Sequence, residues 1–146
     1  MILIPQEGPG KLKFGMKRQD VENLYGKPDQ EFRDDEDNVI WVFNSEKMRF
    51  TFYKDEDYRF GYVICSHPEM ELFGQRVIGK EVSEVKERLK QHGIDAWERE
   101  EFDITVNDFN EKNWLILQSE FGEVVKVESG AVINERDEFV WKGGWS

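Results

Sequence analysis

The stretch "KFGMKRQDVENLYGKPD" (residues 13–29) carries a complete set of signals for one short helix. Val21, Leu24 and Tyr25 recur at the i, i+3, i+4 spacing that places apolar side chains on one helix face. This spacing predicts a helix over residues 17–25. The helix would pack this face against a core and so begin a fold.

The end of this helix is signalled more strongly than its start. Gly26 can adopt the positive φ with which many helices end, and Pro28 prevents the helix from continuing. Lys17 stands where Ser, Thr or Asp would cap best. Because each residue has a structural role, we interpret the stretch as the start of a fold and not as a binding site.

Three apolar runs follow the helix, separated by short polar turns: Val39–Phe43, Met48–Tyr53 and Phe60–Cys65. In the second run apolar and polar residues alternate, the period of a half-buried strand. Spacers this short are typical of an antiparallel meander, since parallel strands need long crossover connections.

The same order of elements then returns. Residues 78–93 have the pattern of an amphipathic helix that ends at Gly93. The strands expected after it cover residues 101–107, 114–119 and 123–129, and a last apolar pair of segments covers Ala131–Ile133 and Phe139–Trp141.

Helix, glycine stop and three strands thus occur twice, at an offset of about 60 residues. An unduplicated α+β domain could show the same order by chance. We predict one α+β domain over residues 1–146, built from two tandem repeats of short helices on a three- to four-stranded antiparallel sheet. The repeats cover residues 10–66 and 72–133, with a C-terminal strand and tail over 134–146. The two sheets would pack as one body or join into one continuous sheet.

A motif near the start of the chain comprises Phe14-Gly15-Met16, Asp20-Val21, Leu24, Gly26 and Pro28. It resembles the helix start of the SmpA/OmlA outer-membrane lipoproteins, and equally the repeat unit of the β-lactamase-inhibitor-protein-like proteins. This resemblance implies an antiparallel sheet with helices on one face, and a tendency toward protein-binding roles. A lipoprotein assembly role is not expected, because no lipobox cysteine stands near the N-terminus.

The charge balance narrows the possible partners. The chain carries 31 acidic and 20 basic residues, a net charge of −11. This excess disfavours nucleic acid and anionic membrane surfaces, which need clustered Lys and Arg, and it favours a basic protein partner. The single cysteine, Cys65, cannot form an internal disulfide, and neither a signal peptide nor a membrane span is recognisable. These features predict a cytoplasmic protein.

No catalytic signature is present. The sequence lacks a phosphate-binding glycine loop and the common nucleophile and metalloprotease motifs. Cys65, His67 and His92 are too few and too scattered to favour a metal site or a Cys–His pair. We therefore expect no catalytic residue, no metal and no cofactor, and the oligomeric state is open.

The aromatic residues suggest a binding role. In a sheet with helices on one face, rings on the other face must be partly exposed, covered by a second layer or used for binding. We predict Trp41, Tyr53, Tyr62 and Trp114 as anchors and Asp35, Asp37, Asp55 and Asp57 as a charged rim. The leading hypothesis is a non-enzymatic immunity or inhibitor protein that blocks a basic toxin or enzyme sterically and electrostatically. The alternative is a small-ligand-binding or hydrolytic domain with a carboxylate-lined pocket between the repeats.

Overall fold

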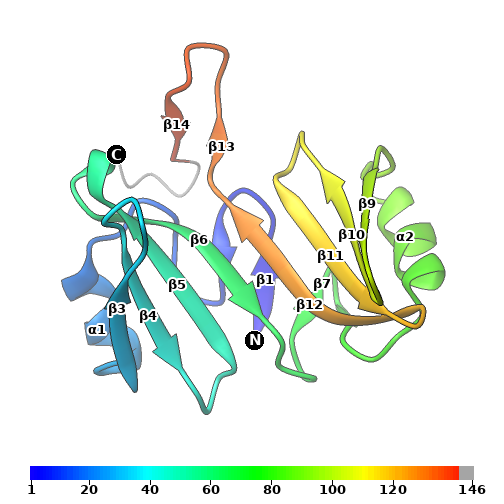
Figure 1. The fold of residues 1–146 in the computed structure, drawn as a ribbon, viewed down its shortest axis with the longest axis horizontal. Coiled ribbons are helices and arrows are strands. Elements are labelled where there is room, and N and C mark those ends of the chain that lie inside the picture. The colour runs from blue at the N-terminus through cyan, green and yellow to red at the C-terminus, as the bar shows by residue number, and fades with distance from the viewer. Residues whose placement is uncertain (142–146) are drawn as a thin grey trace.

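A computed structural model describes residues 1–141 of the chain (Figure 1). Its helices are α1 (Arg18–Tyr25), α2 (Val82–Lys90) and the 3-10 turn η1 (Lys54–Glu56). The strands of the first half are β1 (Ile2–Ile4), β2 (Gly8–Pro9), β3 (Gln30–Arg33), β4 (Val39–Phe43), β5 (Met48–Tyr53), β6 (Arg59–Cys65), β7 (Glu71–Leu72) and β8 (Gln75–Arg76). Those of the second half are β9 (Glu98–Phe102), β10 (Thr105–Asn110), β11 (Leu115–Glu120), β12 (Glu123–Gly130), β13 (Val132–Ile133) and β14 (Phe139–Val140).

Eight of the strands in the described residues form one antiparallel sheet, in the order β3-β4-β5-β6-β12-β11-β10-β9. Its centre is the ladder between β6 and β12, where Cys65 lies opposite Val127. A smaller sheet has the order β2-β1-β7-β8, with β1 and β7 parallel, and β13 pairs with β14 in a separate hairpin. In Figure 1 this hairpin projects beyond one end of the large sheet.

The predicted fold class is wrong. The chain is mostly β, with 43% strand and 14% helix, and the large sheet is not an arrangement of two repeats that each pack helices on a small sheet. The two expected sheets are one continuous sheet, which was one of the two arrangements predicted, and the physical reason lies in the exposed edges of strands. A separate sheet ending at β6 or β12 would leave a row of unpaired backbone groups, whereas pairing these two strands satisfies both edges.

One face of the large sheet carries the core. Both helices and the small sheet contribute buried residues to the same cluster as alternate positions of the large sheet, for example Val21, Leu72 and Leu89 together with Phe50 and Leu117. In Figure 1 α1 lies behind β3–β5 and α2 lies at the other end of the sheet. All covering elements therefore share one face.

The opening motif docks directly on β6. Phe14 and Phe60 are both fully buried, with ring centroids 5.1 Å apart. The backbone N–H of Gly15 donates to the Phe60 carbonyl at 2.7 Å, and the Phe60 N–H donates to the Met16 carbonyl at 2.7 Å. The motif is thus a structural element, as interpreted from the sequence.

The first helix follows its sequence signals closely but not completely. Val21 is fully buried, and Gly26 has φ 78° while its N–H donates to the Glu22 carbonyl at 2.7 Å. The Asp20 side chain accepts the Lys17 N–H at 3.0 Å and so caps the start. Leu24 is 45% exposed, so its predicted place in the core is wrong.

In the second half the expected strand over residues 101–107 is also wrong. Asp103 has φ 58° and forms the turn between β9 and β10, so the segment belongs to two strands. The last apolar pair does form the β13–β14 hairpin. The end of the predicted tail, residues 142–146, lies outside the described residues.

Candidate partner-binding surface

The face of the large sheet opposite the core is the open face. Strand register aligns its side chains in rows across the sheet, since Tyr62 lies opposite Thr51 and Ile64 lies opposite both Arg49 and Glu128. The open face includes Val42, Arg49, Thr51, Tyr62, Ile64, Phe109, Ile116 and Glu128, all exposed or half-buried. Ile40, opposite Thr51 on the same face, is buried. No helix of the described chain contributes to this face.

Aromatic rings lie along the open face, three of them against glycine backbone. A Cβ added to Gly61 would lie 2.3 Å from the ring of Tyr53, and one added to Gly130 would lie 2.7 Å from Trp114 and 2.9 Å from Tyr62. Only glycine leaves room for rings this close. We call the aromatic row the set Phe109, Trp114, Tyr62, Tyr53, Phe139 and Trp141.

Ring–ring contacts occur at both ends of this row. Phe109 and Trp114 meet edge to face, with centroids 5.0 Å apart and an angle of 78°. At the other end Phe139 of the hairpin stacks on Tyr53 at 5.1 Å, and Trp141 stacks on Phe139 at 5.1 Å. The hairpin therefore extends the row beyond the sheet.

Two tyrosines of the row have perturbed hydroxyl groups. Burial, reinforced by the negative charges of Asp34 and Glu36, raises the pKa of Tyr53 to about 12. Burial and the neighbouring carboxylate of Glu128 raise the pKa of Tyr62, whose O–H donates to Glu128 Oε1. The loop around Asp34 thus places negative charge beside an aromatic anchor.

We expect a spectroscopic titration to resolve Tyr53. Its pKa in the folded state lies above the ordinary value of 10. The contribution of this group to the free energy of unfolding is therefore fully present below pH 10 and decreases as the pH rises toward 12. Tyr53→Phe should remove one tyrosinate that forms above pH 11, measured by absorbance at 295 nm, and reduce the loss of stability between pH 10 and 12. An unchanged titration in the variant would contradict this environment.

The four predicted rim carboxylates divide into two pairs. Asp37 lies 3.2 Å from Arg33 Nη1 and 3.7 Å from Lys54 Nζ, and Asp57 pairs with Lys17. Asp35 and Asp55 are exposed, and no ion pair holds either of them within residues 1–141. Only this second pair offers uncompensated charge.

The four predicted aromatic anchors do not all meet. Tyr53, Tyr62 and Trp114 share the aromatic row. Trp41 lies on the core face, 5% exposed, and its Nε1–H donates to Glu31 Oε1 at 2.6 Å. The alternation of β4 therefore removes Trp41 from the surface, and we leave it out of the site.

An apolar cluster at one end of the sheet was not predicted from the sequence. We call it the apolar tip: Phe102, Ile104 and Phe121. Their exposed fractions are 57%, 48% and 85%. The two turns that carry them adjoin, because Thr105 pairs with both Phe102 and Glu120. A signal was available in "EFGE" (residues 120–123), which places Phe where a tight hairpin turn favours Asn or Asp.

Among residues 1–141 no group of three His, Cys, Asp or Glu side chains is placed to hold a metal ion. Within the same residues, no helix has the length and apolar character that crossing a bilayer requires.

Comparison with known proteins gives a fold likeness only. No family model matches the chain, and no curated protein matches it significantly. A solved structure of an extracellular protein containing an SCP domain from Bacillus anthracis str. Ames is similar with a TM-score of 0.51 and 12% identity, covering 79% of this chain and 43% of that one. A cysteine-rich secretory protein from Staphylococcus aureus aligns with a TM-score of 0.47 and 14% identity, covering 88% and 49%. The chain spans less than half the length of either protein.

The predicted cytoplasmic localisation is contradicted by this comparison, because the Bacillus protein with a similar fold is described as extracellular. The inference failed because Cys65 carries no information on the compartment. It is fully buried, and burial raises the pKa of its thiol, so it stays an unreactive core residue in either redox environment.

Proposed function

We propose that the chain is a non-enzymatic protein-binding domain whose open face holds a positively charged protein partner. The observation that carries the proposal is the asymmetry of the large sheet. Both helices and the small sheet cover one face, whereas the other carries the half-buried aromatic row and no helix. Tyr and Trp side chains with an apolar body and a polar end are the residues that dominate protein interfaces.

Charge supports the choice of partner. The net charge of −11 gives a basic protein a long-range attraction that raises its association rate. Close to the aromatic row, Asp34, Glu36 and Glu128 act on the hydroxyls of Tyr53 and Tyr62. Lys or Arg side chains of a partner would pair with these carboxylates while its apolar groups cover the rings.

The more specific form of this proposal is an inhibitor or immunity protein. A basic toxin or enzyme held on the open face would lose access to its own substrate by steric blockade. The loop that carries Asp34 and Glu36 would raise the association rate of the partner, because charge acts mainly on association. The aromatic row would slow its dissociation, because packing acts mainly on dissociation.

The test is site-specific photocrosslinking in the source organism. A benzophenone amino acid at Thr51, on the open face, should capture a basic protein, whereas the same probe at Glu87, exposed on α2, should not. Capture at both positions with equal yield, capture of acidic proteins, or no capture at Thr51 would overturn the proposal.

With the captured partner purified, binding should depend on the aromatic row. We expect Tyr62→Ala to weaken the complex about 30-fold, the effect of removing an interface hot spot. Lys90→Ala, exposed on α2, should change affinity less than twofold. Titration calorimetry at two salt concentrations measures both, and higher salt should weaken the complex. Equal affinities for the two variants would argue against the open face.

A further inference from the structure

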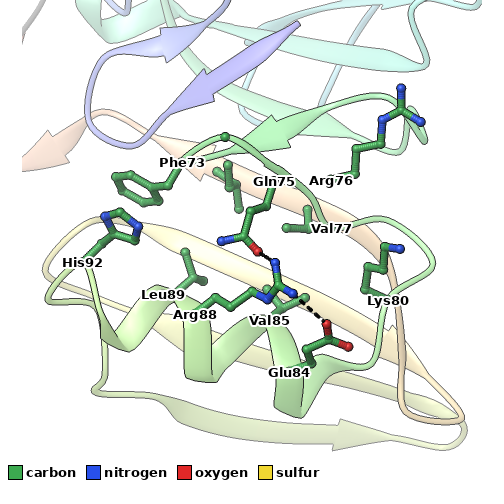
Figure 2. A pocket seen from close by; sticks show the side chains of 12 residues that line it. Phe73, Gln75, Arg76, Val77, Lys80, Glu84, Val85, Arg88, Leu89 and His92 are labelled. Carbon is green, nitrogen blue, oxygen red and sulfur yellow. Dashed lines mark hydrogen bonds and ion pairs between the residues drawn. The ribbon is translucent and has the colours of Figure 1, made fainter.

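A pocket lies on the covered side of the sheet, between the turn that joins β7 to β8 and the exposed flank of α2 (Figure 2). Its volume is about 330 Å³, the lower end of the range for small-molecule sites. The open face is on the other side of the sheet, so the two sites are separate.

The floor of this pocket is apolar. Leu72 and Val77 come from the segment before α2, and Val85 and Leu89 from the helix itself, each no more than 4% exposed. One end is closed by Phe73, whose ring stacks on His92 with centroids 4.3 Å apart and an angle of 11°. An apolar body of modest size could lie on this floor.

The rim of the pocket is basic, although the protein is acidic. Among the lining residues Arg76, Lys80 and Arg88 face a single carboxylate, that of Glu84. In Figure 2 the Arg76 guanidinium points away from the helix, and it lies 3.9 Å from Glu69 outside the pocket. Lys80 and Arg88 are therefore the cations available to a ligand.

Arg88 bridges the pocket from α2 to β8. One terminal nitrogen, Nη1, donates to Gln75 Oε1, and the other, Nη2, lies 3.2 Å from Glu84 Oε1 (Figure 2). A guanidinium has five N–H donors, so these two contacts leave most of them free. Within residues 1–141 the Lys80 ammonium makes no ion pair, so its charge is uncompensated.

We propose that this pocket binds a small organic monocarboxylate with an apolar body. The ligand carboxylate accepts from Arg88 and pairs with Lys80, taking over the contact that Glu84 now makes. The apolar body lies on the floor of Leu72, Val77, Val85 and Leu89. The proposal goes beyond the protein-binding function and does not depend on it.

Decanoate is the probe, used below its micelle concentration, and 1-decanol is the matched uncharged probe. Titration of the uniformly ¹⁵N-labelled protein should move amide signals of residues 72–92 and leave those of the open face unchanged. Decanoate should bind at least tenfold more tightly than decanol, because only the carboxylate pairs with the rim cations.

Two variants and one control separate this site from general association with an apolar surface. Lys80→Gln and Arg88→Gln should each weaken decanoate binding at least fivefold, whereas Lys90→Gln, on α2 but outside the pocket lining, should stay within twofold. The melting temperature of each variant checks folding.

Signal changes scattered over the molecule, equal binding of decanol, or equal affinities in Lys80→Gln and Lys90→Gln would overturn the proposal. None of these results depends on the protein partner, so failure here and failure of the proposed function are distinguishable.

Discussion

Replacing Phe60 by alanine is expected to lower the free energy of unfolding by about 4 kcal/mol. Phe60 is fully buried, and its ring centroid lies 5.1 Å from those of Phe14 and Phe50 and 6.0 Å from that of Phe52. Truncation leaves a cavity that these three rings cannot collapse to fill, since they come from the N-terminal segment and from β5.

Urea unfolding followed by tryptophan fluorescence measures the change, with Phe121→Ala as the matched control. Phe121 is 85% exposed and has φ 52°, so its removal costs little packing. We expect the control to stay within about 0.5 kcal/mol of wild type. A loss below about 1 kcal/mol for Phe60→Ala would contradict the central place of the ring in the core.

Lys86→Met is expected to lower the free energy of unfolding by about 3 kcal/mol, because it leaves a buried carboxylate without its partner. Asp108 is 1% exposed on the core face of β10, and Lys86 Nζ lies 2.8 Å from its Oδ1. Neither Asp108 oxygen accepts a well-directed hydrogen bond within the described residues. The ion pair with Lys86 therefore compensates the buried charge of Asp108. Lys86 Nζ also lies 5.8 Å from the centroid of the Trp97 ring.

The double variant Lys86→Met/Asp108→Leu tests the reason for this cost. With both charges gone, no buried group is left unpaired, and stability should return to within about 1 kcal/mol of wild type. Lys90→Met, exposed on the same helix, should have no measurable effect. Strictly additive losses in the double variant would show that Lys86 acts by packing alone.

Local signals along the chain predicted most of the individual elements. Both helices and the strands β4, β5 and β6 lie where apolar periodicity places them, because each buries one face and so repeats at a fixed period. The short strands β1 and β7 were missed, because two or three residues are too few to show a period. The split at Asp103 was missed because a non-glycine residue with positive φ forms that turn.

The candidate surface was predicted in part, because side chains alternate between the two faces of a strand. Tyr53 and Tyr62 follow the alternation of their strands, and the aromatic row includes both. The burial of Trp41 depends on which face of β4 meets the core, and no local pattern decides this when every residue of the strand is apolar. The pocket at α2 could not be predicted, because its cations come from separate elements that only the fold brings together.

The β6–β12 ladder has a consequence for the order in which this protein can fold. All the remaining ladders of the large sheet join strands that are neighbours along the chain, so each of them can form from a hairpin within microseconds. The central ladder pairs Cys65 with Val127. The entropy cost of closing the long loop between them arises before the contacts of this ladder can stabilise the sheet. Loop closure at the middle of the sheet is thus the slow, entropy-limited step, and until it occurs two unpaired strand edges are open to other chains.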